Sequence, residues 1–309
     1  MPFVVKSFRL PQSPQFLSSL GLIAIAVSSA LWAIAAIVAS ELFQAGVQPF
    51  ELTVARAVIA AIGLAGMNQL RQSTRKRLID WRMLSLGLSL AMVTVTYYIA
   101  IARLSIAVAI VIQYSAPALV VAITALRARR LPTRAMVAAV LAAIVGVVLV
   151  SGLLTGQLQL DGIGLVAAAL SALFFASYTL LSEAVVDTYG AIGVMSRAFL
   201  ISSLFWVAFQ ISQGFPEAVF QAANLPGILF VGIGGTLIPF SLTCWGIQQV
   251  RAERGVIAAT LEPLLAAIFA WLWLGQTLSV MQLLGGGLIL AAVISLQVRS
   301  TPQPLQERK

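Results

Sequence analysis

Long apolar runs separated by short polar segments make up almost the whole chain. A helix that crosses a membrane needs ~20 mostly apolar residues, each adding 1.5 Å of rise. Ten runs reach this length, and the short connections make consecutive helices antiparallel neighbours. The predicted spans cover residues 18–40, 48–69, 83–102, 104–126, 135–154, 162–182, 190–211, 226–248, 252–274 and 278–297.

The pattern of the first half returns in the second half, in the same order. The matching pairs are Ser29-Ala30-Leu31-Trp32 with Ser171-Ala172-Leu173-Phe174, Ser40-Glu41 with Ser182-Glu183, Ala55-Arg56-Ala57 with Ser196-Arg197-Ala198, and Pro117 with Pro263. Each copy holds five spans, and an odd number makes the second copy enter the membrane from the opposite face. Inverted repeats of this kind are typical of secondary transporters. The sequence therefore predicts an all-α membrane protein with ten transmembrane helices in two inverted five-helix repeats around a central cavity.

The repeat also divides the chain. We expect an N-terminal tail over 1–17, a first repeat over 18–154, an external linker over 155–161, a second repeat over 162–297 and a C-terminal tail over 298–309. The basic residues before the first span imitate a signal peptide. The apolar run behind them is longer than a signal core, and nine further spans follow, so we expect this span to be retained.

Composition and charge strengthen the membrane prediction. Of 309 residues, 60% are apolar and 9% are charged, with a formal net charge of +9. The basic residues lie in the short connections, which indicates membrane topology and excludes a nucleic-acid partner. With the N-terminus inside, 16 Lys and Arg residues fall on the inner side and only Arg103 falls outside. This predicts an integral plasma (inner) membrane protein with both termini in the cytoplasm.

Little in the chain supports catalysis. Histidine is absent, the single cysteine, Cys244, lies in an apolar run, and no span has an aspartate in its interior. Without a nucleophile–base pair, a metal cluster or a phosphate loop, we expect no catalytic residue, no metal and no cofactor. A membrane-embedded enzyme and a non-transporting sensor or scaffold remain as alternatives to a transporter.

Several of these features occur together in one known family. They are Trp32 in the first span, an arginine early in the second span of each half (Arg56, Arg197), and a proline in the fourth span of each half, in Gln113-Tyr114-Ser115-Ala116-Pro117 and Thr260-Leu261-Glu262-Pro263. Over about residues 18–297 the chain resembles the EamA-type transporters of the drug/metabolite transporter (DMT) superfamily. The resemblance implies a ten-helix fold with a central cavity that transports small organic metabolites or amino acids, often outward. The family's Gly-Glu-Arg turn is replaced by Ala128-Arg129-Arg130 and Gly275-Gln276-Thr277.

Glu262 is the sharpest candidate for a functional side chain. It lies near the middle of the ninth span, directly before Pro263. Transporters build their sites at such helix breaks near the bilayer midplane. A carboxyl group there could bind a substrate ammonium or carry a coupled proton, and the alternative is a glutamate that only fixes helix packing. We expect kinks at both Pro117 and Pro263.

The two intramembrane arginines have a structural and a functional interpretation. Arg56 and Arg197 lie at similar depths in their spans, and Glu41 and Glu183 end the preceding spans. The structural interpretation is two symmetric ion pairs, Arg56–Glu41 and Arg197–Glu183. The functional interpretation is direct binding of a substrate carboxylate, because an intramembrane charge is a candidate site by default.

Polar and aromatic side chains well inside the spans are the other candidates for the cavity wall. Buried polar groups need partners or water, and inward-facing rings suit an apolar side chain. With Glu262, the candidates are Trp32, Tyr97, Tyr98, Gln113, Tyr114, Phe174, Tyr178 and Trp245. Packing against lipid is the alternative for each ring.

These observations lead to one functional expectation. We expect a secondary transporter of small organic metabolites, in particular amino acids or related amphiphiles, that exports them by alternating access. A permease for drugs or cations, or for sugars or nucleobases, with the same fold is the alternative. The expected partners are the small-molecule substrate, the lipid bilayer and a coupled proton, and the chain suffices as a monomer.

Overall fold

The computed structural model describes residues 14–70, 80–104, 106–151, 153–154, 161–274 and 279–298, and every element in those ranges is a helix. The rest of the chain, including most of both predicted tails and of the linker 155–161, lies outside the described residues. The helices are α1 (Pro14–Gln44), α2 (Pro49–Leu70), α3 (Trp81–Arg103), α4 (Ile106–Gln113), α5 (Ala116–Ala128), α6 (Arg134–Val150), α7 (Gly162–Gln213), α8 (Glu217–Phe220), α9 (Leu225–Gly232), the π-helical turn η1 (Ile233–Leu237), α10 (Ile238–Val250), α11 (Ala252–Ala258), α12 (Leu261–Leu274) and α13 (Val280–Val298).

Many of these helices are long and apolar enough to cross a bilayer. Within the described residues, six helical segments meet both criteria. They are Gln15–Gln44, Pro49–Asn68, Trp81–Ile101, Val108–Ala128, Gly162–Gln213 and Leu225–Val250. Two shorter apolar helices, Arg134–Val150 and Val280–Ser295, accompany them.

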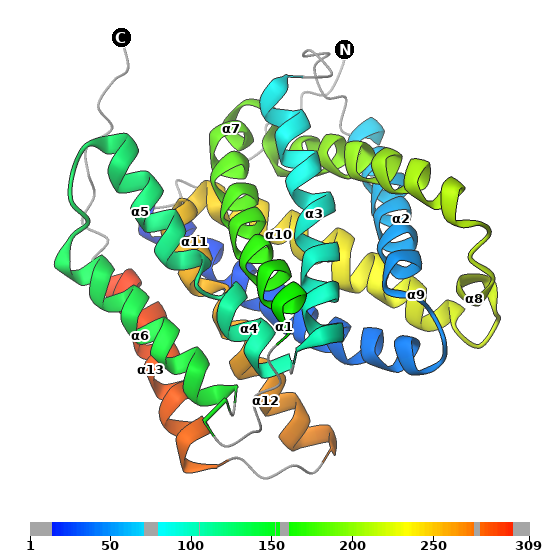
Figure 1. Ribbon diagram of the computed structural model, residues 1–309. Helices are drawn as coiled ribbons and strands as arrows, with labels where there is room; N and C mark the ends of the chain where they lie inside the picture. The colour runs from blue at the N-terminus through cyan, green and yellow to red at the C-terminus, as the bar shows by residue number, and fades with distance from the viewer. Residues whose placement is uncertain are drawn as a thin grey trace, which may run out of the picture.

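Helix α7 differs from the prediction of two spans with a loop between them. The predicted connection between residues 182 and 190 is helical, and the helix bends at Gly190, where φ is 68° and ψ is 158°. Glycine has no Cβ, so it reaches this backbone conformation without steric strain. Figure 1 shows the two parts of α7 running in different directions from the bend.

Each helix of the first half packs on a helix of the second half (Figure 1). Helix α1 packs on α10, α2 and α3 pack on α7, α5 packs on α7 and α11, and α6 packs on α13. The main apolar core therefore contains residues of both halves. Any cavity at this interface is shared by the two halves.

Helices α6 and α13 form a close pair at one edge of the bundle (Figure 1). A Cβ added at Gly146 would lie 2.7 Å from the Gly285 carbonyl oxygen and 2.7 Å from Ile289 Cγ1. A Cβ added at Gly285 would lie 2.7 Å from the Gly146 carbonyl oxygen. Small residues of this kind let helix backbones approach within an apolar medium.

Replacing Gly146 with valine should separate α6 from α13. Overpacking of a tight contact costs about 1–3 kcal/mol, so we expect a lower melting temperature of the purified protein. The matched control is Gly287→Ala, because no atom lies within 4 Å of a Cβ added at Gly287 on α13. Equal melting temperatures for the two variants would show that the contact contributes nothing to stability.

Candidate functional site

The fourth and ninth predicted spans are not continuous helices, because each breaks in its middle. At the first break the Ser115 hydroxyl donates to the carbonyl oxygen three residues earlier at 2.7 Å, and at the second the Thr260 hydroxyl does the same at 2.6 Å. Each break is followed by a proline, Pro117 or Pro263. A proline removes a backbone donor and its ring crowds the preceding turn, so the helix ends before it. The hydroxyl of each break thus adds a hydrogen bond to a carbonyl that also accepts the backbone N–H of the same residue, at 3.1 Å in both breaks.

The two breaks face each other across the two halves. Tyr114 occupies the first break, and Glu262 lies in the first turn of α12, directly after the second break. The Tyr114 hydroxyl donates to Glu262 Oε2 at 2.6 Å. This distance is that of a short O–H···O hydrogen bond. A carboxyl group is therefore held at the meeting point of four short helices.

Arg56 places a guanidinium at the same cavity. Its Nε donates to Thr236 Oγ1 at 2.8 Å, and its Nη1 donates to Tyr98 Oη at 3.1 Å. Its Cζ lies 5.8 Å from the centroid of the Phe240 ring, within the range of a cation–π contact. A guanidinium has five N–H donors, and these two hydrogen bonds use two of them.

The local structure around Thr236 explains why it reaches Arg56. Residues Ile233–Leu237 form a π-helical turn between α9 and α10, and the Thr236 hydroxyl donates to the Val231 carbonyl five residues earlier at 2.7 Å. Such turns are common at functional sites because they change the direction of a side chain within a helix. A Cβ added at Gly235 would lie 2.5 Å from Ala35 Cβ, so only glycine allows α1 to approach this closely.

One cavity contains both charged groups. It is lined by residues from α1, α2, α3, α7, α9, η1, α10 and the two broken spans. The lining residues are Trp32, Ala35, Ala36, Arg56, Val93, Thr94, Tyr97, Tyr98, Gln113, Tyr114, Phe175, Val231, Gly235, Phe240 and Glu262. Apolar and aromatic walls with a few polar groups are characteristic of small-molecule sites.

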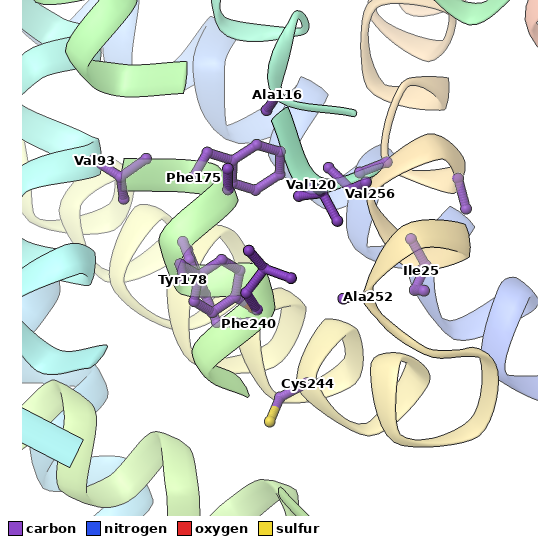
Figure 2. Packing of buried hydrophobic residues seen from close by; sticks show 14 of the residues in the cluster. Ile25, Val93, Ala116, Val120, Phe175, Tyr178, Phe240, Cys244, Ala252 and Val256 are labelled. Carbon is purple, nitrogen blue, oxygen red and sulfur yellow. The ribbon is translucent and has the colours of Figure 1, made fainter. Parts of the chain in front are cut away.

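Aromatic contacts fix one side of the cavity, the floor formed by Phe175 and Phe240 above the buried Tyr178. Phe240 meets Trp32 at 5.1 Å between ring centroids and Tyr178 at 5.5 Å, and Phe175 stacks on Tyr178 at 6.1 Å. Figure 2 shows Tyr178 and Phe240 below Phe175. The buried Trp32 Nε1 has no hydrogen-bond partner among the described residues, so the wall contains an unused donor.

Gln113 is fixed at the edge of the cavity by α7. Its Nε2 donates to Ser171 Oγ at 2.9 Å, and the Ser171 hydroxyl lies 3.5 Å from the Val93 carbonyl oxygen. These contacts tie α4, α7 and α3 together. The Gln113 amide oxygen is a further acceptor at the site, since Nε2 makes the bond to Ser171.

Six of the nine predicted wall residues line the cavity: Trp32, Tyr97, Tyr98, Gln113, Tyr114 and Glu262. The structure places the other three elsewhere. Tyr178 is fully buried beneath the floor, while Phe174 and Trp245 are partly buried against the main core. On α7 the face toward the cavity carries Phe175, and its neighbour Phe174 points about 100° away around the helix.

The prediction of two symmetric arginine–glutamate ion pairs is wrong. Arg56 bonds to Thr236 and Tyr98, and Glu41 is exposed at the end of α1. Glu183 pairs instead with Arg251, at 3.0 Å between Oε1 and Nε. The physical reason is that both glutamates lie within helices that continue past them, so the rotation of the helix sets their direction: Glu41 is exposed, and Glu183 is half-buried beside Arg251.

Arg197 has a different environment from Arg56, its counterpart in the sequence. Its Nη1 donates to the Gly193 carbonyl at 2.8 Å, and its Cζ lies 5.0 Å from the centroid of the Tyr189 ring. It is 9% exposed and does not line the cavity. The two arginines are alike in sequence, but only Arg56 is available to a ligand.

Phe175, Phe240, Thr94 and Thr236 are lining or supporting residues that the sequence reasoning missed. For Thr236 the sequence does contain a signal: the run Gly234-Gly235-Thr236 lies three residues before Pro239, and glycines followed by a proline disturb a helix. Nothing in the pattern alone distinguishes Phe175 from Phe174. Within the described ranges, no group of three acidic or cysteine side chains could hold a metal ion.

Comparisons with known proteins agree with this architecture. The model of the EamA-like transporter family matches residues 19–152 and again residues 162–297. A chain in a solved crystal structure has a TM-score of 0.75 with this one at 20% identity, over 91% of this chain and 97% of that chain. This likeness shows the fold.

The curated relatives are similar over part of their length. The uncharacterized transporter YcbK of Bacillus subtilis (strain 168) is 26% identical over 61% of this chain and 62% of its own length. The uncharacterized inner membrane transporter YicL of Salmonella typhimurium (strain LT2) is 27% identical over 62% of this chain and 63% of its own length. The matches thus span less than two thirds of these relatives. Because the family model matches nearly the whole chain in two copies, the chain belongs to the EamA-like transporter family.

Proposed function

We propose that this chain is a secondary transporter of a small organic metabolite, an amino acid or a related amphiphile. The observation that carries the proposal is the aromatic cavity that holds Arg56 and Glu262, contributed by opposite halves of the chain. Family membership supports transport rather than catalysis.

The charges define how an amino acid would bind. The Arg56 guanidinium receives the substrate carboxylate, because planar N–H donors match a carboxylate. The Glu262 carboxylate receives the ammonium group in competition with the Tyr114 hydroxyl. The substrate side chain then lies against the rings of Trp32, Phe175 and Phe240, which form the apolar wall.

The proposed topology has ten crossings in two inverted repeats. Helix α7 supplies two of them on either side of the Gly190 bend, and each broken pair, α4 with α5 and α11 with α12, supplies one. The segment α9–η1–α10 supplies one, and α1, α2, α3, α6 and α13 supply one each. The distribution of Lys and Arg supports cytoplasmic termini. The name of the Salmonella relative supports an inner membrane location.

Glu262 is also the proposed site of proton coupling. It is the carboxyl group in the cavity wall, and a hydroxyl holds it at 2.6 Å. A proton and a substrate ammonium that compete for one carboxyl group give exchange transport, because only one of them occupies it at a time. Export then follows from an inward proton gradient.

A cationic amphiphile is the second candidate substrate. Glu262 and the surrounding rings suit an organic cation, which needs a carboxylate and aromatic faces but no guanidinium. The two candidates differ in their need for Arg56.

Glu262→Gln should abolish the response of transport to an imposed pH gradient. The glutamine keeps the shape of the side chain but neither carries a proton nor pairs with an ammonium group. The measurement is exchange of labelled amino acids in proteoliposomes, with and without the gradient. Glu217→Gln, an exposed carboxyl group on α8, is the matched control. A Glu262→Gln protein that still responds to the gradient would exclude this site as the coupling group.

Arg56→Gln should raise the KM for an amino acid about 10- to 100-fold, because the carboxylate loses a charge-assisted partner worth about 1.5–3 kcal/mol. The KM for the corresponding decarboxylated amine should not change. Arg197→Gln is the matched control, and we expect it to lower the melting temperature without changing KM. Equal effects of Arg56→Gln on the acid and the amine would rule out carboxylate binding by Arg56 and favour the cationic substrate.

A further inference from the structure

The cavity occupies only one side of the bundle. On α1 and α3 its wall is formed by residues in the later part of each helix, such as Trp32 and Tyr98, and on the α9–α10 segment by the earlier residues Val231 to Phe240. These parts lie toward the turn between α1 and α2. The other side, toward the junction of α10 and α11, is closed by packing of α7 on α10.

Helices α7 and α10 form a seam that runs from the cavity floor to this junction. On α7, Phe175, Tyr178 and Ser182 are spaced three and four residues apart and share one face. On α10, Phe240 and Cys244 follow the same spacing. Figure 2 shows Phe175, then Tyr178 with Phe240, and then Cys244 in order along the seam.

The seam contains polar atoms that its packing does not satisfy. Tyr178 Oη and Ser182 Oγ are buried and make no standard hydrogen bond within the described residues. Ser182 lies beside the thiol of Cys244, which is a weak partner. An unpaired buried hydroxyl is costly, and an apolar side chain of similar size would avoid that cost. The unpaired Tyr178 hydroxyl and the weakly paired Ser182 hydroxyl indicate a surface that has partners in another conformation.

A strained ion pair closes the far end of the seam. Arg251 Nε donates to Glu183 Oε1 at 3.0 Å, and beside it Gln248 donates to Asp187 at 3.1 Å. Arg251 has φ 73° and ψ 162°, a backbone conformation that residues other than glycine avoid. Strain of this kind persists only where surrounding contacts hold it, and it clusters at switch regions.

The opposite end of the same stretch of α7 is tied more loosely. Asp161, which caps α7, lies 3.7 Å from Arg103, compared with 3.0 Å between Arg251 and Glu183. The exposed fractions are 47% for Arg103 and 40% for Asp161, against 79% for Arg251 and 25% for Glu183. The part of α7 before the Gly190 bend thus carries an ion pair near each of its ends, and the shorter one lies at the closed side.

We propose that the α7–α10 seam is the closed half of the transport route and that the Glu183–Arg251 pair is the latch that keeps it shut. This inference rests on the proposed function. When the latch opens, α10 separates from α7, the strained backbone of Arg251 relaxes, and the hydroxyls of Tyr178 and Ser182 meet water or the passing substrate. The route then continues from the cavity to the face that carries the α10–α11 junction.

Cys244 makes the inference directly testable, because it is the single cysteine of the chain and lies buried in the seam. We would measure its rate of modification by a charged methanethiosulfonate reagent in lipid nanodiscs, where both faces are accessible. In the native protein we expect slow labelling. Glu183→Gln should raise the rate about fivefold, which corresponds to ~1 kcal/mol of latch free energy.

Further variants separate the latch from general loosening. Both Arg251→Ala and Arg251→Gly remove the ion pair. Alanine keeps the strained backbone conformation, whereas glycine adopts it without strain. Cys244 should therefore be labelled faster in the Arg251→Ala protein than in the Arg251→Gly protein. The exchanged pair Glu183→Arg with Arg251→Glu should restore slow labelling. Asp161→Asn, which removes the acidic cap at the start of α7, is the matched control and should not increase the labelling rate of Cys244.

Two results would overturn the inference. One is a Glu183→Gln protein that melts normally and labels at the native rate. The other is an Asp161→Asn protein that labels as fast as Glu183→Gln, because the effect would then not be specific to the latch. The labelling experiment does not depend on the identity of the substrate. If labelling changes as expected but no amino acid is transported, the latch stands and the proposed substrate is rejected. If amino acids are transported but labelling does not change, only the latch is rejected.

Discussion

Backbone groups freed by a helix break in an apolar medium must find partners inside the protein, and the architecture of this molecule depends on how two such breaks are satisfied. The hydroxyls of Ser115 and Thr260 each bond a carbonyl of the preceding turn. The prolines that follow prevent the chain from closing the gap into a regular helix. The breaks come from opposite halves, and the hydrogen bond from the Tyr114 hydroxyl to Glu262 connects them.

The hydrogen bond between Tyr114 and Glu262 joins the two breaks at their closest point. It places one carboxyl group where the positive end of α12 stabilises negative charge. The guanidinium of Arg56 lies in the same cavity, held by Tyr98 and Thr236. The cavity therefore presents one acidic and one basic side chain between aromatic walls.

The two halves contribute unequally even though the family model matches both. Arg56 lines the cavity, whereas Arg197 is buried against Tyr189 and the backbone of its own helix. Helix α7 explains part of this difference, because its bend at Gly190 turns the second part of the helix away from the first. The first part packs against α3 and α10, and any movement that opens the closed side must change these contacts.

The sequence by itself determined the helical architecture, the internal repetition and the positions of the breaks. Apolar length, repeated motifs and prolines are properties of the chain that act locally, so they can be read without coordinates. The same is true of Glu262, which was identified by its position beside Pro263 in an apolar run.

The tertiary structure alone decided which partners the charged and aromatic groups have. Glu183 bonds Arg251 and not Arg197, and Phe175 rather than Phe174 lines the cavity. These outcomes depend on the rotation of one helix about its axis, on the π-turn that aims Thr236, and on how far α1 and α7 extend. A shift of one residue changes a side chain's direction by about 100°, and a periodic pattern of mostly apolar residues does not specify that rotation.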